Sequence, residues 1–316
     1  MNSNKVLILG GGGFIGSCLA RRLCHKGHEV HIITPRPFDP QPFELSEGNF
    51  SLHYGSMDNP SLPKRVLPRC NTIIHLASAT TPTDSDKNPI YEVEKNLMPT
   101  VKFLELIQQW AGNLKFIFIS SGGAIYTPRE EKPITENQAL HPKSYYGAGK
   151  IAIESFLKAY AGIHNMDTVI LRPSNLYGPG QPLKAGFGLI RTMLAHIQDR
   201  TTMEIWGDGE IVRDFVYIDD MITLLDRIIE TPDLSGTYNV GFCQGYSINQ
   251  VKEIVEDVTG RTLKAEYINK RKVDIHKVVI DSKKLRHTTG WHPVVPLKLG
   301  ISHTWNWLVN EGHPLK

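Results

Sequence analysis

The sequence predicts an α/β fold with a doubly wound parallel sheet and a second, smaller mixed α/β domain. Over residues 1–172, strand-like apolar runs alternate with helix-length segments, which is typical of parallel strands joined by crossover helices. Beyond residue 172 the elements become shorter and more mixed, and prolines and glycines crowd residues 173–188. We therefore expect one domain over 1–172 and a second mainly over 173–316, with some of its segments returning to the first.

The first strand and the turn after it form the most informative pattern in the chain. Residues 5–9 are an apolar strand-like run, and glycines three apart, at 10, 13 and 16, follow it directly. Such glycines allow a sharp turn, a close approach of a pyrophosphate to the backbone, and tight packing of the next helix. The free N–H groups of that helix then face the phosphates. The pattern predicts a Rossmann-type dinucleotide-binding turn, with Phe14 and Ile15 opening the helix.

The other elements of the first domain follow in order. Strands are predicted at 29–33, 51–54, 72–76, 115–119 and 168–171, each a short run rich in β-branched or aromatic residues. Four prolines between residues 35 and 42 predict a loop after the second strand. Helical patterns cover about 90–110 and begin again near Tyr145. This alternation requires helices on both faces of the sheet.

Composition excludes several classes of protein. The chain has 316 residues, 41% of them hydrophobic and 21% charged, with a net charge of +3 and no long basic cluster. These values indicate a globular protein without a nucleic-acid or membrane surface. We expect no membrane span, no secretory leader and a cytoplasmic location. Four cysteines without metal-type spacing predict no metal site and a reducing compartment: Cys18, Cys24, Cys70 and Cys243.

A tyrosine and a lysine four residues apart form the second informative pattern. On a helix, Tyr146 and Lys150 lie on the same face, so the phenol and the ammonium converge. A fixed cation favours the phenolate, so we expect the pKa of Tyr146 to fall from its usual value of about 10. Tyr146 then serves as a general base.

With both patterns in hand, the chain resembles the extended short-chain dehydrogenase/reductase family, and within it the nucleotide-sugar epimerases and dehydratases, closest to the UDP-glucose 4-epimerase-like group. The resemblance covers nearly the whole length. Besides the glycine turn and the Tyr146/Lys150 pair, the matching segments are Asp58, His75 to Ala77, Asn96, residues 120–126, residues 171–181, residues 206–209, residues 213–220, and Arg271 with Asp274.

The resemblance implies roles for individual residues. Asp58 would face the adenine and Lys150 would also hold the nicotinamide ribose, while Asn175 would touch the substrate near its diphosphate. Arg213 and Arg271 would clamp that diphosphate, which suits the guanidinium fork. The residues expected at the cofactor are Gly10, Gly13, Phe14, Ile15, Gly16, Thr34, Arg36, Asp58, Leu76, Ala77, Asn96 and Lys150. Those expected at the substrate are Ser121, Asn175, Arg213, Arg271 and Val278.

Two positions depart from the family pattern. The family usually has a Ser or Thr where this chain has Gly122, and Ser121 stands one residue earlier. The freedom of Gly123 leads us to expect Ser121 beside Tyr146 as the third catalytic residue. Thr34 replaces the usual carboxylate after the second strand, and Arg36 follows, so NAD is favoured and NADP stays open. His75 is interpreted as a core or backbone-bonding histidine.

The absence of further acids selects the reaction. Dehydratases that resemble this chain carry an Asp-Glu pair where Gly123 and Ala124 stand, and sugar-acid decarboxylases carry a glutamate there. A site with one base can return the hydride to the opposite face of the keto sugar, which is epimerisation at C4. We therefore expect a UDP-hexose or UDP-N-acetylhexosamine 4-epimerase, since in the resembling epimerases a small residue at the position of Val278 leaves room for an N-acetyl group.

Two other functions stay open. A dehydratase or reductase would use the same tyrosine and lysine with a net chemical change, and a non-catalytic dinucleotide-binding sensor would keep only the fold. The resemblance also implies a homodimer that pairs through two long helices, near residues 96–110 and 146–160.

Overall fold

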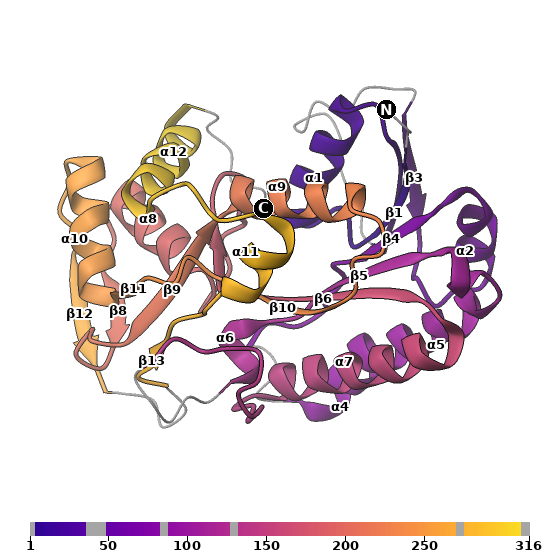
Figure 1. The fold of residues 1–316 in the computed structure, drawn as a ribbon. Helices are drawn as coiled ribbons and strands as arrows, with labels where there is room; N and C mark the ends of the chain where they lie inside the picture. Colours follow the sequence, from indigo (N-terminus) through magenta and orange to yellow (C-terminus); the bar gives the residue numbers. More distant parts are fainter. Residues whose placement is uncertain (1–3, 36–48, 83–87, 127–131, 270–274, 311–316) are drawn as a thin grey trace. The chain divides into compact units, whose positions relative to one another are not determined.

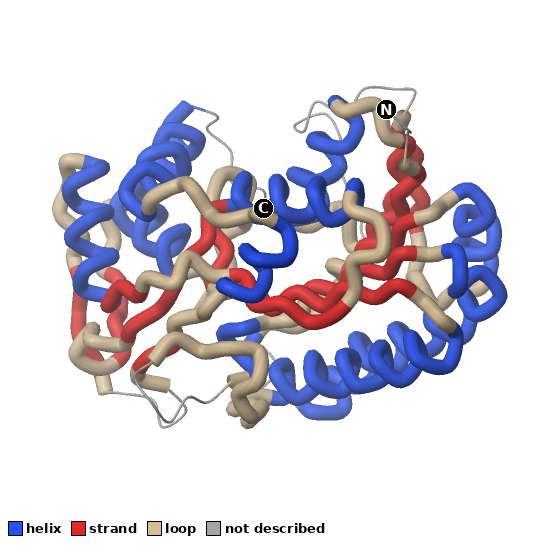
Figure 2. The backbone as a smooth tube through the Cα atoms, in the orientation of Figure 1, coloured by secondary structure: helices blue, strands red, loops and turns tan. Residues whose placement is uncertain are grey.

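Seven strands form the main sheet, in the spatial order β10-β6-β5-β4-β1-β2-β3 (Figures 1 and 2). The computed structural model describes residues 4–35, 49–82, 88–126, 132–269 and 275–310. The strands of this sheet are β1 (Lys5–Leu9), β2 (Glu29–Thr34), β3 (Phe50–Tyr54), β4 (Thr72–His75), β5 (Lys115–Ile119), β6 (Asp167–Pro173) and β10 (Gly236–Val240). Strands β1 to β6 pair in parallel. The predicted parallel α/β fold is confirmed.

Helices cover both faces of this sheet, as its apolar strands require. The side chains of residues 6–9 in β1 are completely buried. Helix α1 (Phe14–His25) and the part of α9 (Ile218–Glu230) from Ile222 onward lie on one side, while α5 (Met98–Ile107) and α7 (Tyr145–His164) lie on the other (Figure 1). On the α5 and α7 side, Phe103, Phe116 and Leu157 belong to one buried apolar cluster. Strands buried on both faces read as continuous hydrophobic runs.

The strand order creates a switch point between β1 and β4. From β1 the chain moves outward to β2 and β3, then returns to β4 on the other side of β1 and continues to β5 and β6. At such a point the loops after the two strands diverge, which opens a crevice at the carboxyl edge of the sheet. The fold therefore brings the glycine turn after β1 to the segment that follows β4.

Two elements differ from the sequence-based prediction. The predicted helix over 90–110 is composite: α4 (Pro89–Glu92), a π-helical segment η3 (Val93–Leu97), α5, and a 3-10 segment η4 (Gln108–Asn113). In addition, residues 236–240 supply β10, an edge strand of the main sheet that was not individually predicted. A short helix α2 (Ser61–Val66) with a 3-10 turn η2 (Leu67–Arg69) connects β3 to β4.

The remaining strands form two smaller sheets. A four-stranded sheet contains β7 (Asn175–Tyr177), β9 (Val212–Tyr217), β11 (Gly245–Ser247) and β13 (Lys277–Val278), and β8 (Met203–Trp206) pairs with β12 (Ala265–Ile268). The helices that accompany them are α6 (Gly122–Ile125), α8 (Leu189–Asp199), α10 (Ile248–Thr259), α11 (Lys283–Thr289) and α12 (Leu297–Asn310). Among the helices of the described ranges, none has both the length and the hydropathy that a bilayer crossing needs.

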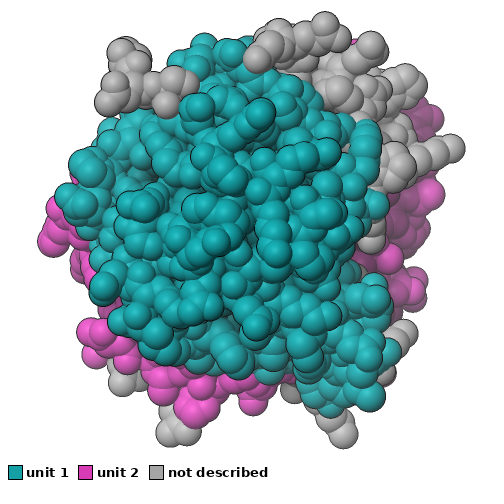
Figure 3. Space-filling view, turned by 90° about the vertical axis from the view of Figure 1, so that its right-hand side faces the viewer, with its two compact units in different colours: residues 1–121, 144–172, 222–238 teal, residues 122–143, 173–221, 239–316 magenta. Residues whose placement is uncertain are grey.

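The chain divides into two compact units, coloured separately in Figure 3. Unit 1 comprises residues 1–121, 144–172 and 222–238, and unit 2 comprises 122–143, 173–221 and 239–316. One segment of unit 1 ends at Arg172 and one segment of unit 2 begins at Pro173, while the division into a cofactor domain and a substrate domain stays a prediction. The segment 222–238 returns to unit 1, and the segment 122–143, which lies before residue 172 in sequence, belongs to unit 2.

Candidate active site

The turn after β1 excludes side chains by its geometry. Gly10 has a φ of +81°, and a Cβ built on it would lie 2.8 Å from both Cα and N of Ala77. A Cβ on Gly16 would lie 2.8 Å from the carbonyl oxygen of Gly10. Helix α1 begins with Gly13 as its N-cap, which provides no side-chain hydrogen bond to the first turn. The result is a backbone cradle at a helix N-terminus, which fits the pyrophosphate of a dinucleotide.

The predicted cofactor residues gather at the carboxyl ends of β1, β2 and β4. The N–H of Gly10 donates to the carbonyl of Ile33 over 3.0 Å, and the N–H of Leu76 donates to that of Leu9 over 2.9 Å. Thr34 ends β2 and is 5% exposed. Asp58 lies beyond β3, with one carboxylate oxygen 3.8 Å from Lys102 Nζ. Arg36 lies outside the described residues.

Asn96 holds the segment after β4. Its Oδ1 accepts from the N–H of Ala79 over 2.7 Å, and its Nδ2 donates to Thr80 Oγ1 over 2.9 Å. Asn96 is 5% exposed and lies in the π-helical segment η3. The side chain therefore fixes the loop behind Ala77, and its direct contact with a cofactor stays a prediction.

Helix α7 brings the tyrosine and the lysine together. Ser144 is the N-cap, and its hydroxyl accepts from the N–H of Gly147, so the helix begins at Tyr145. Lys150 Nζ lies 5.5 Å from the centre of the Tyr146 ring and donates to the carbonyl of Ile119 over 2.9 Å. The lysine is 5% exposed, although it is charged in its usual state. The carbonyl at the end of β5 therefore anchors this buried ammonium.

Two consecutive serines after β5 point to different partners. The hydroxyl of Ser121 forms a hydrogen bond with the phenol of Tyr146. Ser120 instead donates to Glu154 over 2.6 Å, and Glu154 forms a buried ion pair with Arg172 at 2.5 Å. Alternation of side chains in extended backbone accounts for this division. The structure thus brings Ser121, rather than Gly122, to the tyrosine.

The pKa of Tyr146 moves in the opposite direction from the sequence-based expectation. Burial raises it to about 12, the negative charge of Glu92 adds to this effect, and only the hydrogen bond with Ser121 lowers it. Burial also lowers the pKa of Lys150 to about 8, against the charges of Glu92 and Glu154. Loss of hydration disfavours both charged forms, and it exceeds the attraction that the spacing alone predicts. Lys150 is therefore the member of the pair that titrates near neutral pH.

His75 is a core histidine, as interpreted from the sequence. It is 1% exposed, its Nε2 lies 2.9 Å from Thr100 Oγ1, and its ring packs against Phe118. Thr100 donates to the carbonyl of Asn96, so its hydroxyl oxygen accepts from His75. Burial, aided by the charge of Lys150, lowers the pKa of His75 to about 3. The ring is neutral and structural at the pH of the cell.

The sequence-based reasoning missed Glu92, the last residue of α4. Its side chain is 3% exposed, and Thr80 donates to its Oε2 over 2.5 Å. It also shifts the pKa values of both Tyr146 and Lys150. The available signal was Gly149, a glycine inside a helix, where it costs roughly 0.5–1 kcal/mol relative to alanine and so needs a packing reason.

The residues expected at the substrate diphosphate lie in unit 2. Asn175 Nδ2 donates to the carbonyl of Asp214, and Arg213 donates to the carbonyls of Val212 and Ile275, each over 2.8 Å. Val278 is 2% exposed and pairs with Arg213 in the parallel β9–β13 ladder. Arg271 lies outside the described residues.

Asp214 organises this sheet. Its carboxylate accepts from the N–H groups of Phe242 (3.1 Å), Cys243 (3.2 Å) and Ile280 (3.1 Å). Burial raises its pKa to about 7 against these hydrogen bonds. The side chain ties β9 to the segments after β10 and β13, which fixes the register that sets Arg213 beside Val278.

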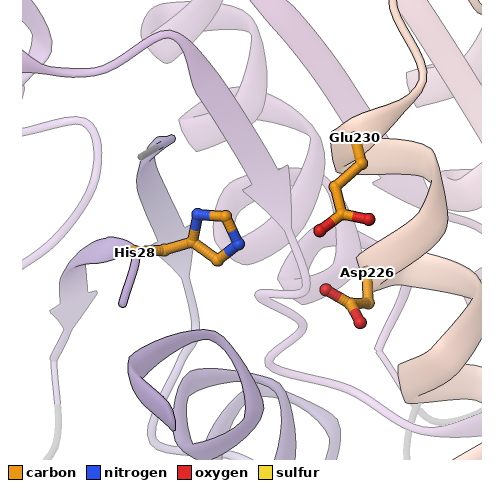
Figure 4. Close-up of side chains that lie close together, drawn as sticks. All are labelled: His28, Asp226 and Glu230. Atoms are coloured by element: carbon orange, nitrogen blue, oxygen red, sulfur yellow. The ribbon is translucent and has the colours of Figure 1, made fainter. Parts of the chain in front are cut away.

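A second cluster of titratable groups contains His28, Asp226 and Glu230, whose side chains converge in Figure 4. Lys26 Nζ already binds both carboxylates, 2.8 Å from Asp226 and 2.9 Å from Glu230. The N–H of Asn4 donates to His28 Nδ1 over 3.1 Å, so in the neutral ring Nε2 carries the proton and offers no lone pair. This chemistry is that of an ion-pair network joining α1 and α9, and we assign no metal to it.

The fold and the site define a class: a dinucleotide-dependent enzyme with a Rossmann sheet, a glycine turn and a tyrosine–lysine pair on the helix after β5. Residues 6–241 match the NAD dependent epimerase/dehydratase family. The chain belongs to this family, so its dinucleotide is NAD, and the glycine cradle and Lys150 are the parts of this chain that suit it.

Known relatives resemble the chain over nearly its full length. It is 28% identical over 312 residues to a UDP-glucose 4-epimerase of Mycolicibacterium smegmatis, covering 97% of this chain and 99% of the relative. It is 29% identical over 305 residues to a dTDP-4-dehydro-6-deoxyglucose reductase of Escherichia coli, covering 94% and 95%. The crystal structure of UDP-glucose 4-epimerase from Thermotoga maritima with UDP-glucose superposes with a TM-score of 0.90 at 28% identity, covering 98% and 100%.

Proposed function

We propose that the protein is a nucleotide-sugar 4-epimerase that acts on UDP-hexoses or UDP-N-acetylhexosamines. The observation that carries the proposal is the hydrogen bond between Tyr146 and Ser121. The residues Gly123 and Ala124, shortly after Ser121 in the sequence, have no carboxylate. This arrangement provides one acid–base group and no carboxylate at the two positions where related dehydratases have an acid. The similarity to UDP-glucose 4-epimerases supports the choice of substrate.

In this mechanism, the phenolate form of Tyr146 accepts the proton of the C4 hydroxyl and becomes a phenol, and it later returns this proton to the keto oxygen, which restores the phenolate. Ser121 orients the phenol and donates to the same sugar oxygen. Lys150 stabilises the transient phenolate by its charge and stays in place because Ile119 accepts one of its protons. The glycine turn after β1 and Lys150 would hold NAD, which would supply a hydride acceptor and then a hydride donor, so that no net redox change results.

Unit 2 would recognise the diphosphate through Arg213, Arg271 and Asn175. Val278 is a compact side chain buried next to Arg213, and we propose that its size admits an N-acetyl group. The expected effect of Val278→Tyr is a selective loss of turnover for UDP-N-acetylglucosamine while UDP-glucose is still converted. Equal turnover of the acetylated sugar by wild type and variant would disprove this role.

We also propose a homodimer that pairs through the α5 and α7 side of unit 1. Large apolar side chains are exposed there on α4, η3 and α5: Ile90 (66%), Val93 (44%) and Met98 (46%). Helix α7 adds Phe156 (49%) and Ile163 (74%). A Phe156→Glu/Ile163→Glu variant should halve the mass measured by light scattering; an unchanged dimer mass would contradict this surface.

A cytoplasmic location is part of the proposal. None of the four cysteines, which all lie in the described ranges, forms a disulfide, and Cys18 and Cys24 are buried as small apolar side chains in α1. Microscopy of the tagged protein in its source cell would test it, and accumulation outside the cytoplasm would contradict it.

The decisive experiment is an activity assay without added cofactor. Purified protein is incubated with UDP-glucose, UDP-galactose and their N-acetylamino forms, and the anomeric and C4 protons are followed by NMR. Interconversion of C4 epimers without added cofactor supports the proposal. Formation of a 4-keto-6-deoxy sugar would favour a dehydratase, a strict need for added NAD(P)H a reductase, and no reaction despite bound cofactor a sensor.

A further inference from the structure

The residue before Lys150 in helix α7 is Gly149, which has no side chain. A Cβ built on Gly149 would lie 2.8 Å from Cγ and 2.9 Å from the carboxyl carbon of Glu92, and closer still to its Oε1. Real Cβ atoms do not approach other atoms so closely, so only glycine fits while Glu92 keeps its position. The carboxylate of Glu92 therefore lies directly against the backbone of the helical turn between Tyr146 and Lys150.

A chain of hydrogen bonds holds the carboxylate there. Asn96 donates to Thr80 (2.9 Å), and Thr80 donates to Glu92 (2.5 Å), with all three side chains at least 94% buried. A buried carboxylate is costly unless it is bonded, and this one receives a short hydrogen bond from a group that is itself oriented. The π-helical segment η3 begins at the next residue, which is a common feature of functional sites.

The charged and titratable groups that face Lys150 come from three elements. Glu92 belongs to α4, Glu154 and Tyr146 to α7, and His75 to β4. His75 is neutral, and Glu154 is already paired with Arg172 at 2.5 Å. Among the described residues, Glu92 forms no ion pair within 4.0 Å, and its hydrogen-bond donor is the neutral hydroxyl of Thr80.

We propose that Glu92 is a positioning residue of the active site, whose carboxylate, admitted by Gly149, keeps the Lys150 ammonium charged beside Tyr146. This inference rests on the proposed function for the roles of Tyr146 and Lys150. Glu92 does not touch the reacting atoms. It acts through the lysine, against the loss of hydration that burial imposes on the ammonium.

The charge is tested with Glu92→Gln, which keeps the shape of the side chain and an acceptor for Thr80. The titration of Lys150 is followed through its ¹³Cε NMR signal, assigned with Lys150→Met. We expect the pKa of Lys150 to fall by about 1 in Glu92→Gln, as for removal of a nearby opposite charge. Glu94→Gln is the matched control, because it removes the same charge from an exposed position in η3 and should leave this titration unchanged. An unchanged pKa in Glu92→Gln would overturn the proposal.

The pH profile of turnover provides the functional readout. Removing one negative charge lowers the pKa of both Lys150 and Tyr146, so both limbs of the profile should move to lower pH. At pH 8, turnover should drop about fivefold if the charged fraction of Lys150 controls it. A lower turnover with both limbs of the pH profile at the same pH as in the wild type would indicate a merely structural role and contradict the proposal. Should Glu92→Gln not fold, Glu92→Ala replaces it, and a Lys150 titration identical to wild type would again overturn the proposal.

The geometry is tested by a double-mutant cycle. Gly149→Ala should lower the melting temperature by several degrees with Glu92 present, and should be tolerated in a Glu92→Ala background. Gly162→Ala in the same helix is the matched control, because a Cβ there meets nothing within 4 Å. It should not lower the melting temperature. Additive effects of Gly149→Ala and Glu92→Ala would refute the contact. The NMR and melting experiments need no substrate. They therefore decide this inference even if the assay without added cofactor detects no interconversion of C4 epimers.

Discussion

The glycine turn after β1 and the charge cluster on α7 lie in the same compact unit but are built by different means. The turn is made from the backbone of consecutive residues, and Gly10 and Gly16 serve it by excluding side chains. The cluster is made from side chains of separate elements: Glu92 from α4, Ser121 after β5, and Tyr146 and Lys150 from α7. The glycine turn is thus a mainly local structure, while the cluster around Tyr146 and Lys150 exists only after the sheet and helices have packed.

Glycine illustrates the difference. Gly10 is needed for a positive φ as well as for space, whereas Gly149 lies in ordinary helix and is needed only because a carboxylate from another element occupies its side. The need for a positive φ at Gly10 can be inferred from the neighbouring residues. The need for glycine at 149 depends on Glu92, which lies far earlier in the chain.

The largest expected effect is on the buried ion pair that supports the charge cluster. Within the part of the chain that the structure describes, Arg172→Met leaves the buried Glu154 with the hydroxyl of Ser120 as a donor and Lys158 at 3.6 Å as its ion-pair partner, and should destabilise the protein by about 3–5 kcal/mol in denaturant unfolding. The double variant Arg172→Met/Glu154→Met removes both charges and should regain part of the loss. If the single variant were as stable as wild type, the cluster would not depend on tertiary pairing and the comparison would fail.

Tyr146→Phe should separate chemistry from binding. Removing the phenol should lower turnover by at least ~10²-fold, because a general acid–base group contributes that much. Folding and NAD binding should persist, since the glycine turn does not involve this side chain; circular dichroism and calorimetric titration would check both. Unchanged turnover would exclude Tyr146 from the chemical step, and lost NAD binding would mean that the two regions are not separable.

Gly10→Ala should damage the other region. The positive φ and the contact with Ala77 together should cost about 2 kcal/mol or more and weaken NAD binding. Gly27→Ala is the control, because Gly27 has the same φ of +81° with nothing within 4 Å of a Cβ. The difference between the two variants measures the close approach alone. Equal losses would leave only backbone strain as the reason for Gly10.

The smallest effect concerns His75, at the end of β4 between the two regions. Its pKa is lowered to about 3 when folded, so below an unfolded value near 6.5 the unfolded chain binds the extra proton and stability falls as pH decreases. Between pH 7.0 and 5.5 this costs the wild type roughly 1 kcal/mol. His75→Gln lacks this cost, so its stability deficit against wild type should shrink by the same amount. A deficit independent of pH would show that His75 is not held neutral by burial.

Much of unit 1 was predictable because its patterns are local. The apolar runs predicted β1 to β6, the glycine spacing predicted the turn, and α7 begins at Tyr145 because Ser144 caps it. By contrast, β10 was not individually predicted. Its five residues follow α9, far in sequence from the other strands of the main sheet, and nothing in their local pattern indicates that they pair with β6. The long helix before β5 was predicted as continuous, and its π-helical interruption was not.

The amino-acid sequence alone determined the order of strands and helices, the glycine turn, and the spacing that sets Tyr146 and Lys150 on one face, because these depend on neighbours in the chain. Tertiary structure decided the protonation behaviour of the pair. Burial raises the pKa of Tyr146 to about 12 and lowers that of Lys150 to about 8, and Glu92 reaches both from another helix. Hydration and distant charges set these values, and neither exists for a residue until the chain has folded around it.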